Sequence, residues 1–519
     1  MSDFFTQLKT APSYQKQHRV PLSLVCLISL MAGCLLPFAL APYHWWWLAI
    51  LSPALLYACL HQRNSKHAFF IGWSYGIGLW FVGAFWLYTS IHVYGDTPAP
   101  LAMLMIAFMA IVMGLFSAFQ AWIYRRFFPA TPLTFAPLWV FFEWIKTWIF
   151  TGFPWLFAGY AFTTYGLDEY APLLGIFGVS FVVIVIASAL TEALFGKRFW
   201  LVPIALLLIG AWGAKQLHWV EEKNTAPLSV SLIQGNIPQD LKWLVEYQAE
   251  TLSIYATLSQ TEWGRDLVVW PEASIPMFQN EIEPFINAID KHAQKRGSTW
   301  ITGIPYWDTE HTGLEPLYYN AIRVSGQDSS GLYFKQRLVP FGEYTPFSGA
   351  LSWVLPGLQD DVTMAGFSAG HAQQPPLHIK DHQLASAICY EVAYPNLTRR
   401  NSHHTDFLVT ISNDAWFTGT AAPWQHLQMV QMRAKENGRW IIRATNTGVT
   451  AFINEQGHIV KQLPMDQRAV LRGELPAYTG DTPYSRFGDW TILLFCTFLL
   501  GLGILLKPKV VNTDFKKRR

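Results

Sequence analysis

The sequence is poor in charged residues. Asp, Glu, Lys and Arg make up 14% of its 519 residues, whereas about 25% is usual in soluble proteins. Cysteine is also scarce, with five in the whole chain, which excludes a scaffold held together by disulfides. Gly (36) and Pro (31) are close to their ordinary frequency, which excludes a collagen-like chain. A formal net charge of +2 gives no sign of nucleic-acid binding.

The few charges are distributed unevenly along the chain. Residues 1–217 are about 8% charged with a net charge of +5, and residues 485–519 also carry +5. Residues 218–484 are about 17% charged with a net charge of −8. The high apolar content of 51% rules out a disordered chain. The near-neutral total therefore hides a polar middle region between two basic, apolar ones.

Long apolar runs account for the shortage of charge. A membrane-spanning helix needs about 20 mostly apolar residues, and we identify eight candidates. They lie at 21–40, 45–60, 69–91, 99–124, 134–149, 172–193, 199–217 and 489–506. The fifth run holds Glu143 and Lys146. At this spacing the two side chains can pair on one helix face, which we prefer to a role in facing a substrate.

Basic residues in the short connecting segments predict the topology, because Lys and Arg collect on the cytoplasmic side. They occur before the first run and then in every second loop, at Lys9, Lys16, Arg19, Arg63, Lys66, Arg125, Arg126, Lys197 and Arg198. The basic tail 507–519 follows the eighth run. We therefore expect both termini in the cytoplasm and residues 218–488 on the opposite face. Pro42 after Ala39-Leu40-Ala41, and the further apolar runs, argue against a cleaved signal peptide.

The middle region has the pattern of an α/β domain. Short runs rich in β-branched residues predict strands at 228–234, 267–270, 299–303, 320–325, 384–389, 407–412, 440–444 and 449–454. Amphipathic stretches predict helices at 241–262, 281–295 and 423–437. We expect four units: a seven-span membrane domain (1–217), an extramembrane domain (225–480), an eighth span (489–506) and a basic tail (507–519).

Cys389 is the only cysteine of the middle region, and its neighbours favour a catalytic role over that of a small buried hydrophobe. Three segments carry chemically reactive side chains, and the first and third lie at the ends of predicted strands, where α/β sheets hold ligands. They are 268–272 (VVWPE), 333–344 (YFKQRLVPFGEY) and 387–391 (AICYE). A thiolate can act as nucleophile, a carboxylate as base and an ammonium as oxyanion stabiliser. Each residue alone is weak evidence, because an exposed Glu–Lys pair is usually solvated surface.

These segments resemble the Glu-Lys-Cys motifs of the nitrilase, or carbon–nitrogen hydrolase, superfamily. With eight spans around the domain, the whole chain resembles one family within it, apolipoprotein N-acyltransferase. Further matching segments are 151–155 (TGFPW), 234–237 (QGNI), 412–417 (SNDAWF) and 446–450 (NTGVT). The family has Gly directly after Trp416-Phe417, whereas this chain has Thr418 before Gly419, which puts the local backbone of that loop in doubt.

The resemblance implies an eight-span helical bundle with an αββα sandwich domain, and a reaction. Cys389 would take an acyl chain from a phospholipid, typically phosphatidylethanolamine, as a thioester. The chain would then pass to the α-amino group of an S-diacylglyceryl cysteine at the N-terminus of an apolipoprotein. Glu272 would be the base and Lys335 the oxyanion stabiliser. The supporting residues would be Asn320, Glu343, Tyr390 and Glu391, with Trp243 associated with substrate.

The apolar segment 344–370 contains no Lys or Arg, and a connection this long is usually functional or disordered. We interpret it as a mobile lid over the acyl groove, in which Trp353 and Leu355 would contact substrate. The alternative is a loop packed on the domain. His403-His404 lacks further ligands at metal-binding spacing, so we expect no metal and no cofactor.

Two other functions remain open. A membrane-tethered amidase or hydrolase would use the same residues with water as acceptor, and a transporter or scaffold would carry a degenerate domain. All three members of the triad are present, which argues against the scaffold. The resemblance implies a monomer in the bacterial inner membrane, with the catalytic domain in the periplasm.

Overall fold

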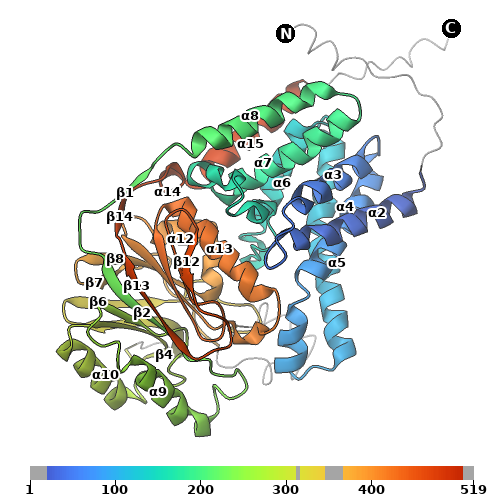
Figure 1. Ribbon diagram of the computed structural model, residues 1–519. Helices are drawn as coiled ribbons and strands as arrows, with labels where there is room; N and C mark the ends of the chain where they lie inside the picture. Colours follow the sequence, from blue (N-terminus) through green and yellow to red (C-terminus); the bar gives the residue numbers. More distant parts are fainter. Residues whose placement is uncertain (1–19, 311–315, 345–365, 507–519) are drawn as a thin grey trace, which may run out of the picture.

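The computed structural model describes residues 20–310, 316–344 and 366–506. Within them the chain forms a bundle of helices and, beside it, a sheet-rich domain (Figure 1). Trp353, Leu355 and most of segment 344–370 lie outside the described residues. The lid and these two substrate contacts therefore stay predictions.

Each of the eight apolar runs contains an α-helix. The helices are α2 (Leu22–Leu35), α3 (Leu48–Leu60), α4 (Ser65–Gly83), α5 (Ala99–Phe127), α6 (Pro132–Ile145), α7 (Ala171–Leu194), α8 (Leu201–Ala214) and α15 (Trp490–Leu505). Within the described residues, three helical segments are long and apolar enough to cross a membrane: Leu22–Ala39, Ala99–Phe127 and Leu167–Leu194. Four more are apolar but shorter. Eight membrane crossings therefore remain a prediction.

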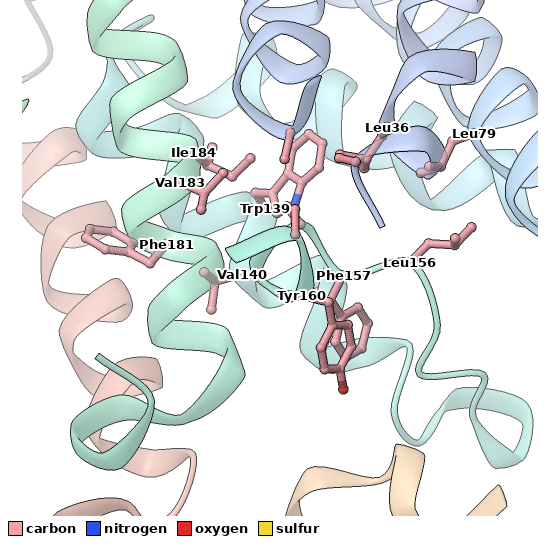
Figure 2. Packing of buried hydrophobic residues seen from close by; sticks show 14 of the residues in the cluster. Leu36, Leu79, Trp139, Val140, Leu156, Phe157, Tyr160, Phe181, Val183 and Ile184 are labelled. Atoms are coloured by element: carbon pink, nitrogen blue, oxygen red, sulfur yellow. The ribbon is translucent and has the colours of Figure 1, made fainter. Parts of the chain in front are cut away.

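Glycines allow two helices of the bundle to approach closely, and large apolar side chains fill the space between others. A Cβ atom on Gly76 of α4 would lie 2.6 Å from the Cα atom of Gly114 of α5. Any larger residue there would push the two helices apart. Figure 2 shows Trp139 of α6 with Val183 and Ile184 of α7 in the same buried apolar cluster. The bundle is thus a close-packed support for the neighbouring domain.

Glu143 and Lys146 do not form the expected ion pair. Glu143 is 2% exposed and accepts a hydrogen bond from the indole Nε1 of Trp139 at 2.8 Å. Lys146 lies just past the end of α6, and its Nζ stands 5.4 Å and 5.1 Å from the ring centroids of Trp80 and Phe157. The two charges interact electrostatically, but the ammonium lies against aromatic faces and makes no salt bridge with the carboxylate.

The sheet-rich domain contains twelve strands in one continuous hydrogen-bonded order, β12-β11-β10-β9-β8-β7-β6-β5-β4-β3-β2-β13, within the described residues. The strands are β2 (Leu228–Gln234), β3 (Leu267–Val269), β4 (Thr299–Asp308), β5 (Leu317–Gly326), β6 (Ser329–Phe334), β7 (Leu377–Ile379), β8 (His382–Ile388), β9 (Phe407–Ser412), β10 (Trp440–Thr445), β11 (Ala451–Ile453), β12 (Ile459–Gln462) and β13 (Ala469–Leu475). A separate antiparallel pair, β1 (Val220–Glu222) and β14 (Tyr478–Gly480), joins the two ends of the domain.

The long sheet folds over, so that β10 lies against β2 and the two halves share one core. Successive side chains of a strand point to opposite faces of the sheet. In β3, Leu267 and Val269 point into the shared core, whereas Val268 packs with the helices outside. Outside one half lie α9 (Val245–Ser259) and α10 (Glu283–Lys295); outside the other lie α12 (Pro395–Asn401) and α13 (Ala422–Asn437). The short helix α14 (Pro483–Phe487) leads to α15. The layers form the αββα sandwich that the resemblance implies (Figure 1).

Candidate active site

Glu272, Lys335 and Cys389 each stand just beyond the end of a strand, after β3, β6 and β8 respectively. The structure brings Glu272 and Lys335 into contact, with 3.1 Å between Lys335 Nζ and Glu272 Oε1. The Cys389 thiol interacts electrostatically with both side chains. Three segments up to 117 residues apart in the sequence therefore meet in one place.

The Glu272 carboxylate is held in position through both oxygens. Oε1 accepts from Lys335 Nζ and, at 2.8 Å, from Asn320 Nδ2. Oε2 accepts from the backbone N–H of Asn413 at 2.7 Å. Burial alone would raise the pKa of Glu272, but the Lys335 charge and these hydrogen bonds together lower it. The side chain is thus an ionised carboxylate, ready to accept a proton.

Lys335 is 1% exposed and lies between two carboxylates. Its Nζ is also 2.9 Å from Glu343 Oε1. Burial would lower the pKa of Lys335, but the charges of Glu272 and Glu343 raise it well above its usual value. Glu343 is itself held by the amide of Asn320 (2.9 Å) and the backbone N–H of Val339 (2.8 Å). Lys335 therefore remains a fixed cation, suited to stabilise an oxyanion and unsuited to deliver a proton.

Cys389 has a strained backbone, with φ at +53°. A residue other than Gly in this left-handed region costs about 1–3 kcal/mol, and such strain collects at functional sites. Burial, followed by the negative charge of Glu272, raises the pKa of the Cys389 thiol. The resting side chain is therefore a thiol, and a thiol needs a base before it can attack a carbonyl carbon. The ionised carboxylate of Glu272 is the candidate for that base.

Glu391 binds the nucleophile turn to the segment that carries Lys335. Its two carboxylate oxygens accept from the backbone N–H groups of Ile388 (2.7 Å), Gln336 (2.5 Å) and Arg337 (3.1 Å). The Tyr333 hydroxyl donates to the same carboxylate at 3.0 Å. Burial raises the pKa of Glu391 to about 7, against the effect of these donors. Its contacts assign it a supporting role.

Tyr390 connects the nucleophile turn to the bundle. Its hydroxyl donates to the carbonyl oxygen of Gly152 at 3.1 Å, and that of Tyr394 donates to the same atom at 3.0 Å. The Tyr344 hydroxyl reaches Thr151 Oγ1 at 2.9 Å. Gly152 has a φ of +91°, which favours glycine at this point. The segment 151–155 therefore serves as a dock for the active-site loops.

Trp243 lies half-buried in the turn before α9. Its neighbour Lys242, which sequence reasoning missed, is fully buried, and its Nζ donates to the backbone carbonyl of Glu272 at 3.1 Å. Burial lowers the pKa of Lys242 to about 8. The contact of Asn413 with Glu272 was also missed. The sequence offered a clue to it, because Asn413 belongs to the segment 412–417 that resembles a family motif.

The loop after 412–417 accommodates its extra residue. Thr418 has an ordinary φ of −52°, and Gly419 takes the left-handed conformation at +76°. Before it, Trp416 and Phe417 make edge-to-face contacts with Tyr94 and Trp86 of the bundle, at 5.8 Å and 4.9 Å between ring centroids. In the described parts of the chain, no three His, Cys, Asp or Glu side chains group as metal ligands would.

A buried carboxylate, ammonium and thiol on a four-layer sandwich are the features of a carbon–nitrogen hydrolase domain. The family model described as carbon-nitrogen hydrolase matches residues 229–484. A second model, described as the N-terminal domain of apolipoprotein N-acyltransferase, matches residues 32–189 in the bundle.

Relatives extend the similarity over nearly the whole chain. The apolipoprotein N-acyltransferase of Azotobacter vinelandii is 41% identical over 491 residues, which cover 92% of this chain and 94% of that protein. The enzyme of the same name from Pseudomonas aeruginosa PAO1 is 40% identical over 499 residues, 93% of this chain and 96% of the other. The chain belongs to the apolipoprotein N-acyltransferase family.

Proposed function

We propose that this protein transfers an acyl chain from a membrane phospholipid to the α-amino group of an N-terminal S-diacylglyceryl cysteine. The family name specifies an apolipoprotein as acceptor and N-acylation as the reaction. The observation that carries the mechanism is the buried contact of Lys335 with Glu272, next to the strained and protonated Cys389. We propose phosphatidylethanolamine as the typical donor.

The first step is acylation of Cys389. Glu272 takes the thiol proton as Sγ attacks the ester carbonyl, and the charge that develops on the carbonyl oxygen is stabilised by Lys335. When the tetrahedral intermediate collapses, the ester C–O bond breaks and Glu272 returns its proton to the departing lysophospholipid. The product is a thioester on Cys389. Asn320 and Glu343 keep the carboxylate and ammonium aligned during this exchange.

The second step is aminolysis. The neutral α-amino group of the diacylglyceryl cysteine attacks the thioester carbon, and Glu272 accepts a proton from the attacking nitrogen. The C–S bond then breaks, the proton passes to the Cys389 sulfur, and an amide forms. One nucleophile serves donor and acceptor in turn, so the kinetics are ping-pong. We assign Trp243, Trp353 and Leu355 to substrate contacts in this cycle.

Both proposed substrates are lipids in a bilayer, so a helical bundle in the same membrane would keep the enzyme next to them. We propose that α2–α8 and α15 all cross the bacterial inner membrane, with units bounded at 1–217, 225–480, 489–506 and 507–519. The domain would lie on the periplasmic side and both termini in the cytoplasm. Tethered in this way, the enzyme meets both substrates by lateral diffusion, and we propose that it acts as a monomer.

Water is the competing acceptor, because the domain belongs to a hydrolase superfamily. The full-length protein in vesicles is given phospholipid with a labelled acyl chain, with and without a diacylglyceryl cysteine peptide. We expect the label to appear in the peptide's amide. Release of labelled fatty acid at the same rate in both samples would instead identify a hydrolase.

A further inference from the structure

One buried histidine, His426, contacts the backbone of Cys389 but takes no part in the reaction described above. His426 belongs to the first turns of α13 and is 5% exposed. Its Nε2 is 3.0 Å from the backbone carbonyl oxygen of Cys389. A carbonyl oxygen only accepts hydrogen bonds, so Nε2 carries a proton and donates it.

The other ring nitrogen is fixed by a buried polar network. Nδ1 of His426 lies 3.2 Å from Asp414 Oδ1 and 3.2 Å from a guanidinium nitrogen of Arg443. Asp414 Oδ2 accepts from Arg443 at 2.8 Å, and Ser412 Oγ donates to Oδ1 at 2.6 Å. Burial would raise the pKa of Asp414, but the charge of Arg443 lowers it strongly. The network keeps the imidazole in one orientation.

The bond to Cys389 acts on the strained part of the backbone. The carbonyl of Cys389 and the N–H of Tyr390 belong to one planar peptide unit and point in opposite directions. Fixing the oxygen therefore fixes the direction of that N–H and the ψ angle of a residue whose φ is +53°. Without this contact Cys389 loses a restraint on its left-handed conformation, and relaxation of its φ and ψ together turns the Cα–Cβ bond and so moves Sγ.

We propose that His426 is a positioning residue, whose Nε2–H holds the Cys389–Tyr390 peptide unit and thereby aims the nucleophile at the ester carbonyl. The proposal rests on the proposed function, since it presumes that Cys389 forms the thioester. His426 does not act as the base, because its protonated nitrogen already donates to a backbone oxygen and its other nitrogen faces Arg443 and Asp414.

α13 extends the same support to the bundle. Gln425, the residue before His426, accepts a hydrogen bond from the indole Nε1 of Trp155 at 2.6 Å. The ring of His426 also lies 6.4 Å from that of Trp155. Two neighbouring side chains of one helical turn thus make the two contacts. Gln425 bonds to the Trp155 loop of the bundle, and His426 bonds to the backbone of Cys389. The position of Sγ is tied through this turn to the bundle.

Two amide substitutions separate positioning from a general structural role. In His426→Gln the amide nitrogen reaches the place of Nε2 and keeps the bond to Cys389. In His426→Asn the amide reaches only the place of Nδ1, so the network side is kept and that bond is lost. Gln431→Leu is the matched control, since it removes a 2.9 Å bond from α13 to the Gly457 carbonyl and no contact to Cys389.

The measurement is single-turnover acylation of the full-length protein in vesicles of labelled phosphatidylethanolamine, with the melting temperature of each variant. We expect the acylation rate of His426→Asn to fall about 10- to 100-fold at an unchanged apparent KM. His426→Gln should recover most of that loss, and Gln431→Leu should match the wild type. Should His426→Asn not insert, His426→Phe keeps the ring volume, lacks the donor and replaces it.

The outcomes are distinguishable. A wild-type protein that forms no thioester contradicts the proposed function and this assignment with it. A normal wild-type rate with equal rates for the Asn and Gln variants overturns the role of His426 alone. If the acylation rates of both variants fall in proportion to their melting temperatures, the positioning role is overturned as well, because His426 is then only a structural side chain.

Discussion

Cys389 depends on its neighbours for reactivity, because its own surroundings disfavour the thiolate. Burial and the charge of Glu272 raise the pKa of the thiol, and Lys335 acts in the opposite direction. The resting side chain is therefore a thiol. In the proposed mechanism Glu272 removes the proton as Sγ attacks, so that base and nucleophile act as one unit.

Replacement of the nucleophile gives the first prediction. Cys389→Ser should fold and insert normally but lose acyl transfer by roughly 10³-fold or more, because a serine hydroxyl is a much weaker nucleophile beside a carboxylate base. Transfer from labelled phospholipid measures the loss. Cys59→Ser, in α3, should keep wild-type activity. A Cys389→Ser protein with full activity would contradict the mechanism.

Glu272 gives a pH dependence with a defined sign. Its pKa is lowered from the usual value, mainly by Lys335 against the effect of burial. Activity needs the ionised form, so kcat/KM should be constant above the usual carboxyl range and fall as the pH drops through the depressed pKa. In Glu272→Gln the residual activity should lack this acidic limb, while Glu474→Gln, at an exposed position on β13, keeps it. An acidic limb that persists in Glu272→Gln would exclude this residue as the base.

At the scale of elements, the site depends on how strand ends are joined to each other. Glu391 accepts from donors at the end of β8 and in the segment after β6. It therefore keeps the Cys389 turn and the Lys335 segment in register, although the two strands do not pair directly.

Glu391→Gln tests this joint. The glutamine retains one acceptor oxygen and turns an NH₂ group toward backbone N–H donors, so we expect a loss of about 2–4 kcal/mol in unfolding free energy. Tyr333→Phe removes one donor and leaves the carboxylate, and should cost about 1 kcal/mol. Thermal or denaturant unfolding measures both variants. Equal stability of Glu391→Gln and wild type would show that the carboxylate does not hold the two segments.

The elements that the sequence predicted well are the buried ones. The expected bounds 228–234 and 407–412 match β2 and β9, whose continuous apolar runs reflect burial on both faces. Six strands were missed: β1, β7 and β14 have only three residues each, and the partly exposed faces of β6, β12 and β13 dilute the apolar pattern. The helix expected at 241–262 begins only at Val245, since the preceding residues form the turn that buries Lys242.

The meeting of Glu272, Lys335 and Cys389 was predictable from the family motifs, and for Glu272 and Cys389 also from the strands that precede them. The network around His426 was not. The sequence predicts an amphipathic helix at 423–437, with one polar face, yet most polar side chains of α13 are buried. Arg443 lies inside a predicted strand, where a charge carries no signal of its own. Only tertiary packing brings such residues to the site.

At the scale of the whole molecule, alternate loops of the bundle lie at opposite ends. Arg63 contacts the start of α2 through the Val20 carbonyl (3.0 Å), and Arg125 donates to the Arg63 carbonyl (2.8 Å). The loops on the other side, at Ala41 and Trp155, bond to Gln428 and Gln425 of α13. The loops at Arg63 and Arg125 are thus on the side away from the sheet-rich domain, which is the arrangement that the proposed topology predicts.

Reporter fusions test this orientation. We expect a fluorescent protein fused after Arg519 to fluoresce, and alkaline phosphatase inserted at the exposed turn Gln327-Asp328 between β5 and β6 to be active, since it is active only in the periplasm. Exchange of the two reporters should silence both. Fluorescence from the turn, or phosphatase activity from the C-terminus, would contradict the proposed topology.

A covalent intermediate at Cys389 is central to the proposed mechanism. The full-length protein, incubated with phospholipid and without acceptor, is digested and each Cys-containing peptide is weighed by mass spectrometry. We predict one acyl chain on the Cys389 peptide, sensitive to hydroxylamine and lost when a diacylglyceryl cysteine peptide is added. Transfer that proceeds with the Cys389 peptide unmodified, or with the chain on another residue, would contradict it.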